Sequence, residues 1–213
     1  MNWIVQTLGS SVGKKLLMAV TGLGFIGFLI AHLAGNLSIY AGRDAFNSYA
    51  EHLHSLGPLL NLAEIGLLAL AVVHVFTGAV LFYQNWQARP ARYRVYKTSG
   101  GRSIGSATMP YTGFLILLFV IFHLNNFSFV DKTDTTIFEI VARSFQQPAY
   151  VILYVAAMIV VALHVSHGFW SLFQTLGASH PKYTPILTAL GIVVSVVFAV
   201  GFGFIPLYIT FMV

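Results

Sequence analysis

Four histidines stand inside apolar segments that are long enough to cross a membrane. They are His32, His74, His123 and His164, one in each of four successive segments. An ionisable side chain inside a bilayer is rare and usually serves a function. Neutral imidazole is a ligand for zinc, copper, nickel and haem iron, so this pattern predicts a site that holds a metal or a metal cofactor.

Two short repeats sort these histidines into pairs. The second and fourth segments contain HVFTGAVLFYQ and HVSHGFWSLFQ, which share the pattern H-V-x-x-G-x5-Q. The first and third segments share T-G-x9-H-L. Repeats on helices that run in the same direction place their histidines at matching depth. The sequence therefore predicts the pairs His74/His164 and His32/His123.

Two pairs of axial histidines suit two b-type haems, because each iron takes one ligand from each of two helices. Counting from the basic edge of the spans puts His32 and His123 at ~26 and ~20 Å, and His74 and His164 at ~20 and ~17 Å. A flat macrocycle also needs small residues close to its ligands. The glycines about one turn beyond three of these histidines are candidates for that role: Gly35, Gly78 and Gly168.

His167 lies three residues after His164 and corresponds to Thr77 in the repeat. We therefore interpret His167 as a residue that does not ligate iron. Glycine is also a common packing residue in membrane helices, so the glycines alone do not establish a haem site.

The elements that must position these histidines are membrane helices. The chain has 213 residues, of which 57% are hydrophobic and 8% charged, against about 25% charged in soluble domains. It contains no cysteine, which excludes disulfides, thiolate-held clusters and covalently attached haem. We predict one all-α domain, 1–213, in which the first four of five spans form a four-helix bundle around two haems. The spans are expected at about 15–40, 61–86, 110–129, 148–175 and 184–212.

The charges indicate a topology. Eight of the eleven lysines and arginines fall on one side of the predicted spans, and all six acids fall on or near the other. The basic residues are Lys14, Lys15, Arg89, Arg92, Arg94, Lys97, Arg102 and Lys182. The positive-inside rule places the N-terminus in the cytoplasm and the C-terminus outside. This charge pattern explains the basic residues without nucleic-acid binding.

Two connections outside the spans have helical spacing of apolar residues. The first is GRDAFNSYAEHLHSLGP, where we expect a short amphipathic helix at the outer interface with Asp44 as its cap. The second, between the third and fourth spans, has apolar residues at 137, 140, 141 and 145.

Several stretches together resemble a known family, the five-helix, di-haem cytochrome b subunit of succinate:quinone oxidoreductases and quinol:fumarate reductases. These stretches are LIAHLAGN, GRDAFNSYAEH, VVHVFTG, FVIFHLNN and ALHVSHGFWSLF. Each motif alone is weak. Four histidines in order, one per helix and followed by a helix without histidine, make the set fairly specific.

The resemblance implies specific roles. His32 and His123 would ligate the haem distal from the catalytic subunits, and His74 and His164 the proximal haem. The chain would be a quinone-reactive electron-transfer subunit in a bacterial cytoplasmic membrane, surrounded by lipid, with menaquinone as the expected quinone. An iron–sulfur subunit and a flavoprotein subunit would dock on the cytoplasmic side, and the flavoprotein would interconvert succinate and fumarate. A dimer of the whole complex is left open.

The resemblance does not fix the quinone and proton site. Glu51, His54 and Glu64 are the candidates near the end of the first loop. Some family members also carry an acid within the fourth helix for transmembrane proton return. Residues 149–170 contain no aspartate or glutamate, which puts such compensation in doubt.

Three alternatives stay open on the sequence. One is the di-haem cytochrome b subunit of a hydrogenase, formate dehydrogenase or nitrate reductase, in which histidines would be doubled on some helices. Another, from a different class, is a transporter that uses mid-membrane histidines. The third is an anchor that keeps its haem for structural reasons only.

Overall fold

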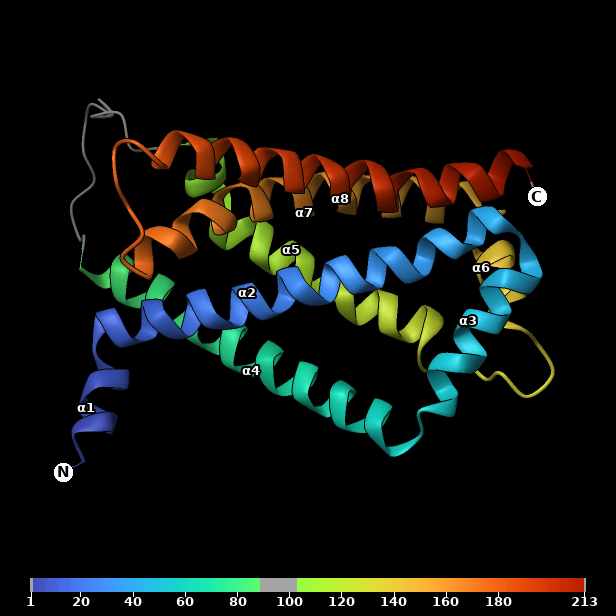
Figure 1. Cartoon of the computed structure of the whole chain (residues 1–213), viewed down its shortest axis with the longest axis horizontal. Helices are drawn as coiled ribbons and strands as arrows, with labels where there is room; N and C mark the ends of the chain where they lie inside the picture. The colour runs from blue at the N-terminus through green and yellow to red at the C-terminus, as the bar shows by residue number, and fades with distance from the viewer. Residues whose placement is uncertain (1, 89–102, 213) are drawn as a thin grey trace.

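The computed structural model describes residues 2–88 and 103–212, and the regular elements within them are all helices (Figure 1). In chain order they are α1 Trp3–Gly9, α2 Ser11–Asn36, a 3-10 helix η1 Leu37–Ala41, α3 Arg43–Ser55, α4 Pro58–Gln87, α5 Ile104–Phe127, α6 Ile137–Phe145, α7 Pro148–Thr175 and α8 Thr184–Met212.

Five of these helices are long and apolar enough to cross a membrane: α2 continued by η1, α4, α5, α7 and α8. They contain 24 to 31 residues each, or roughly 36 to 46 Å of helix, against ~30 Å of hydrocarbon. The two chain ends lie at opposite ends of this bundle (Figure 1). The prediction of an all-α membrane protein with five spans is confirmed.

One predicted boundary is clearly wrong. The third span begins at Ile104 rather than at 110, so Pro110 lies inside α5. The Ser103 hydroxyl caps this helix by accepting the Ser106 N–H at 3.1 Å. Proline is tolerated inside membrane helices because neighbouring groups satisfy the freed backbone, and it therefore does not mark the helix start here.

The first loop forms the expected short helix, α3, but its cap differs from the prediction. Asp44 lies in the first turn, and the capping position is Gly42, at φ 100° with no side-chain hydrogen bond. Gly57, at φ 52°, ends the connection to α4. Both glycines adopt backbone conformations that other residues rarely take, and so α3 can turn sharply away from α2 and α4.

The connection between the third and fourth spans contains α6, which packs against α3. Its first turn is a capping box, in which Thr136 and Glu139 satisfy each other's backbone N–H groups. Asn47 accepts the Phe138 N–H at 3.1 Å, and Arg43 pairs with Glu139. The apolar side of α6 is buried with Phe46 and the ends of α7 and α8. We call this end of the bundle, formed by α3 and α6, the acidic end.

The spans are packed unequally. α7 and α8 contribute together to two core clusters, in one of which Ile209 and in the other Phe198 is almost completely buried. In α4, by contrast, Thr77 is the single buried residue among those described, and large apolar side chains such as Phe76 are exposed. An exposed apolar helix of this length requires lipid or another apolar partner around it.

The opposite end of the bundle carries the start of α2 with Lys14 and Lys15 and the α7–α8 turn with Lys182, and we call it the basic end. The other five residues of the predicted basic side, Arg89, Arg92, Arg94, Lys97 and Arg102, lie outside the described residues.

Candidate cofactor site

The four histidines lie as two pairs, each joining two helices. His32 of α2 and His123 of α5 have ring centroids 5.9 Å apart, with ring planes at 89°. His74 of α4 and His164 of α7 have centroids 6.5 Å apart, at 64°. These are the combinations that the repeats indicate.

The spacing of each pair fits a metal held between two imidazoles. Metal–histidine bonds are about 2 Å long, so two opposed imidazoles on one metal have centroids on the order of 6 Å apart. Among the described residues, no group of three or more His, Cys, Asp or Glu is arranged to hold a metal ion. A bare zinc ion takes three or four protein ligands. Two histidines per site therefore fit a metal whose other ligands come from a macrocycle.

Threonines from neighbouring helices contact the rings of the His74/His164 pair. Thr21 Oγ1 of α2 lies 2.9 Å from His74 Nδ1, and Thr112 Oγ1 of α5 lies 3.1 Å from His164 Nδ1. Both threonines are buried, with exposed fractions of 4% and 5%. Each histidine of this pair is thus held by a hydroxyl on an adjacent helix.

These contacts favour one tautomer in both rings. The Thr21 hydroxyl also donates to Leu17 O at 2.7 Å, and the Thr112 hydroxyl lies 3.1 Å from Thr108 O. A carbonyl can only accept and a threonine hydroxyl has one hydrogen, so that hydrogen goes to the carbonyl. The Nδ1 of each histidine then donates to the threonine oxygen. Nε2 is left with its lone pair, the form in which imidazole ligates a metal.

The glycine that follows each threonine, on α2 and on α5, also lies beside the ring of the histidine on the neighbouring helix. A Cβ atom added at Gly22 would lie 3.7 Å from His74 Cε1, and one added at Gly113 would lie 3.4 Å from His164 Cε1. The Thr-Gly dipeptides of the repeat therefore serve the histidine of the neighbouring helix in the same way twice. The threonine bonds the ring, and the glycine, which has no side chain, leaves space beside it.

The predicted macrocycle glycines differ in how closely other residues approach them, and only Gly35 lies in a tight contact. Beside Gly78 is Met18, whose Cε would be 3.6 Å from an added Cβ, and beside Gly168 is Met109, at 3.9 Å. A Cβ at Gly35 would collide with the Tyr49 ring of α3. For Gly35 this contact accounts for the glycine by itself. A place next to a haem stays a prediction for all three.

The His32/His123 pair has aromatic surroundings. His32 stacks on Phe28, with centroids 5.2 Å apart and planes at 15°, and Phe202 of α8 lies 5.5 Å away. Its nearest polar partner at Nδ1 is the Asn36 amide, at 3.5 Å. That distance is at the limit of a hydrogen bond.

His123 is similarly enclosed. Phe119 and Phe127 lie 5.8 and 5.4 Å from its ring, and the Tyr154 hydroxyl of α7 lies 3.4 Å from its Nδ1. One turn along α5, the Asn126 Nδ2 atom is buried and has no hydrogen bond of normal geometry among the described residues, although the Asn126 side chain lies next to the Tyr154 hydroxyl. A buried amide of this kind normally has a partner, and a polar group of a bound cofactor would supply one.

The predicted quinone and proton candidates are not at the histidine pairs. Glu51 and His54 are exposed on α3, and Glu64 is exposed near the start of α4. The His54 ring bonds the Ala50 carbonyl of its own helix, at 2.7 Å. No recorded contact joins any of these side chains to His32 or His123 within the described residues, so their roles stay predictions.

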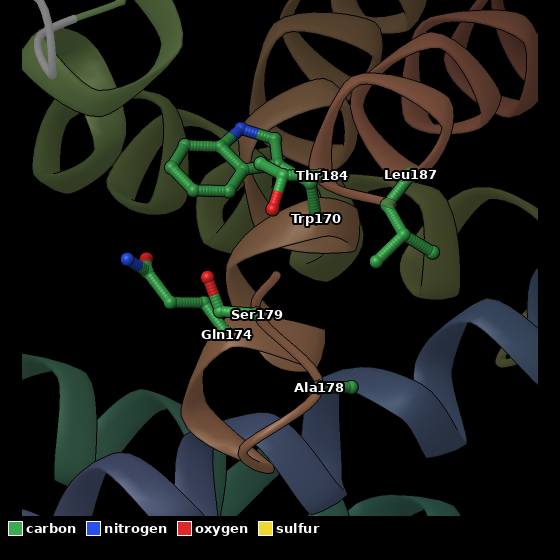
Figure 2. A pocket seen from close by; sticks show the side chains of 6 residues that line it. All are labelled: Trp170, Gln174, Ala178, Ser179, Thr184 and Leu187. Atoms are coloured by element: carbon green, nitrogen blue, oxygen red, sulfur yellow. The ribbon is translucent and has the colours of Figure 1, made fainter. Parts of the chain in front are cut away.

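His167 has other neighbours than a second histidine ring. Its ring lies against Trp170, with centroids 5.2 Å apart, and its Nδ1 is 3.5 Å from Ser103 Oγ. A nearby hollow of about 10 Å³ is lined by Trp170, Gln174, and residues of the α7–α8 turn and the start of α8 (Figure 2). It is smaller than the about 300 Å³ at which ligand pockets begin, and neither histidine pair lines it.

Sequence reasoning missed the residues that bond the histidine rings. Thr21 and Thr112 are part of the T-G-x9-H-L repeat, but that repeat was used only to locate His32 and His123. The available signal was a buried polar residue at the same place in both copies of a repeat. Tyr154 gave no comparable signal, because it occurs once and in an aromatic-rich segment.

Together, the fold and the paired rings define a class: a five-span helical membrane protein with two interhelical pairs of histidines. Comparison with known proteins agrees with this class. The chain is 26% identical over 172 residues to the "Succinate dehydrogenase cytochrome b558 subunit" of Bacillus subtilis (strain 168), covering 79% of this chain and 82% of that one. It is 35% identical over 63 residues to the "Succinate dehydrogenase hydrophobic membrane anchor subunit" of Halobacterium salinarum, covering 30% of this chain and 48% of that one.

No family model and no solved structure matches the chain. The two curated relatives nevertheless support the resemblance to the membrane subunits of succinate:quinone oxidoreductases, at modest identity.

Proposed function

We propose that this chain is the membrane anchor and cytochrome b subunit of a succinate dehydrogenase or fumarate reductase complex. The names of its two relatives support this assignment. The observation that carries it is the pairing of four intramembrane histidines across two pairs of helices, with ring centroids 5.9 and 6.5 Å apart.

In the proposed complex the chain holds two haems b. His74 and His164 would hold the proximal haem, and His32 and His123 would hold the distal haem. Bound haem supplies one-electron transfer, and an iron with two axial histidines leaves no open position for another ligand. The protein supplies the ligand nitrogens, their orientation and an environment closed to water.

The proposal includes partners and an orientation. An iron–sulfur subunit and a flavoprotein subunit carry the succinate and fumarate chemistry at the basic end, which faces the cytoplasm. The acidic end faces outward, and a quinone reacts beside the distal pair. Glu51, His54 and Glu64 remain its candidate proton groups, because quinone chemistry moves protons as well as electrons.

The apolar surface of α4 fits a lipid environment. A groove of about 540 Å³ between α2 and α4 is lined mainly by apolar residues, including Leu17, Val72 and Phe76, and Lys14 is also part of its lining. An acyl chain fits such a surface, and the ammonium group suits a lipid headgroup.

Haem quantification tests the proposal. The purified complex is examined by a dithionite-reduced minus oxidised spectrum together with pyridine haemochrome analysis. Two haems b per chain are expected. One haem would break the assignment of four ligands, and no b-type absorbance would favour a transporter that uses its histidines otherwise.

A further inference from the structure

We propose that Thr21 and Thr112 are positioning residues for the proximal haem: their hydroxyls hold the two ligand histidines in one tautomer and lower the reduction potential of the iron. This inference rests on the proposed function, because it takes His74 and His164 as axial ligands. It assigns a role to two threonines that contact the ligand histidines and do not themselves bind iron.

The geometry is the same at both positions. Each threonine lies on the helix beside its histidine, is buried, and has its Oγ1 2.9 or 3.1 Å from an Nδ1 atom. Each also has a main-chain carbonyl of its own helix as the acceptor for its single hydrogen. The ring N–H therefore has one acceptor, and a rotated or exchanged tautomer would leave a buried donor unsatisfied.

This arrangement has an electronic consequence. A hydrogen bond donated by the Nδ1–H of a ligating histidine makes the imidazole a stronger base toward the metal. A stronger donor stabilises ferric iron more than ferrous iron and so lowers the reduction potential. Two such bonds on one haem both lower its reduction potential. Both threonine oxygens are buried, so water does not compete for these bonds.

Because of the repeat, α2 and α5 each contribute one residue to both histidine pairs. In both helices the threonine stands eleven residues before the histidine, from Thr21 to His32 and from Thr112 to His123. Eleven residues of helix rise ~16.5 Å. Each helix thus bonds a ligand of the proximal haem at one level and provides a ligand of the distal haem about three turns further on.

The experiment uses the complete complex with Thr21→Val, Thr112→Val and the double variant. Valine has the shape of threonine without the hydroxyl. Potentiometric titration of the haem absorbance is expected to show a higher midpoint potential for the proximal haem and an unchanged one for the distal haem. A tenfold change in the relative affinity for ferric and ferrous haem corresponds to about 59 mV, which is the upper expectation for each single variant.

Two controls make the result specific. Thr21→Ser and Thr112→Ser keep the hydroxyl and are expected to restore the original potential. Thr188→Val removes a hydroxyl of α8 whose one hydrogen bond within the described part of the chain is to the Thr184 carbonyl, at 2.9 Å, and is expected to leave both potentials unchanged. If a valine variant loses the proximal haem, the ratio of haem to protein in the serine variant decides whether the hydroxyl was responsible.

The outcomes separate this inference from the proposed function. A wild-type complex without two haems overturns the proposed function. A wild-type complex with two haems, together with valine variants that keep both haems at unchanged potentials, overturns the positioning role alone. A shift confined to the distal haem would also overturn it, since the threonines contact the other pair.

Discussion

The two histidine pairs are built from matching helices but are held in different ways. In the His74/His164 pair, which we propose holds the proximal haem and call the proximal pair, both Nδ1 atoms have a buried threonine hydroxyl at 2.9 and 3.1 Å. In the His32/His123 pair, the proposed distal pair, the Nδ1 contacts are an amide at 3.5 Å and a phenol at 3.4 Å. Four phenylalanines lie within 6 Å of the distal rings, as measured between centroids.

This difference shows two ways of fixing a histidine ring. Hydrogen bonds to an adjacent helix define which nitrogen carries the proton, and so they act on the electronic state of the ligand. Aromatic packing fixes the plane of the ring and excludes water, but it leaves the ring nitrogens less constrained. We therefore expect the proximal pair to respond to loss of single hydroxyl groups, and the distal pair to respond less.

The largest expected effect comes from removing a ligand. His74→Ala or His164→Ala should lower the haem content from two per chain to one, because an iron with one remaining axial histidine binds weakly in a membrane bundle. His32→Ala or His123→Ala should remove the other haem. Pyridine haemochrome analysis of each purified complex measures the ratio.

His167→Ala is the matched control, since this histidine lies three residues from His164 but against Trp170 and Ser103. It should retain both haems. If His167→Ala loses a haem and His164→Ala keeps both, His167 rather than His164 would be the ligand. That result would favour the cytochromes with doubled histidines.

The second largest effect is expected at the close contact between α5 and α7. A Cβ at Gly105 of α5 would lie 2.8 Å from His167 Cβ and 3.1 Å from the Leu163 carbonyl of α7. Gly105→Ala should therefore destabilise the protein by about 1–3 kcal/mol, the usual cost of overpacking. Thermal unfolding in detergent measures the change.

Gly66→Ala provides the comparison, because nothing lies within 4 Å of a Cβ at that position on α4. It should leave stability equal or raise it by up to about 1 kcal/mol through helix propensity. Equal destabilisation by the two alanines would mean that the close approach of α5 and α7 has no special importance.

Much of the fold could be predicted because the membrane simplifies the pattern. Long apolar runs had to become helices, and the spacing of apolar residues at 137–145 correctly indicated α6. The histidine pairs followed from repeats, since residues at corresponding positions of parallel helices lie at corresponding depths. Two local predictions failed. The third span was expected to begin at 110, but the Ser103 cap places its start earlier, and Asp44 was expected as a cap where Gly42 turns the chain.

The contacts between helices could not be predicted in the same way. Sequence periodicity says little about a span that is apolar on all sides, so the neighbour of a given residue depends on how the helices pack. The Thr21–His74 bond and the Gly35–Tyr49 contact are both of this kind. A role near the distal pair for the acids of the first loop is likewise left as a prediction.

A smaller effect is expected at the distal pair. Tyr154→Phe removes the hydroxyl 3.4 Å from His123 Nδ1 and keeps the ring that packs against Phe119 and Phe145. Because this hydrogen bond is long, the midpoint potential of the distal haem should shift less than that of the proximal haem in Thr21→Val. Redox titration of both variants makes the comparison, and a larger shift in Tyr154→Phe would reverse the proposed difference between the pairs.

The smallest expected effect is the pH dependence of the acidic end, beside the distal pair. The Thr136 N–H donates to the Glu139 carboxylate at 3.0 Å and lowers the pKa of Glu139, and the adjacent Arg43 guanidinium lowers it further. A carboxyl group whose pKa falls on folding stabilises the folded state above its ordinary pKa of 4.5, and that contribution is lost as the pH falls through the folded value.

Wild-type protein should therefore lose more thermal stability between pH 7 and pH 4 than Glu139→Gln does. Because the Glu139 side chain is 40% accessible to solvent, the difference should be small. Glu51→Gln, which changes an exposed acid of α3, should retain the wild-type dependence. The same pH dependence in wild type and Glu139→Gln would show that the contact between α3 and α6 depends on the apolar packing of Phe46 and Phe138 rather than on this carboxylate.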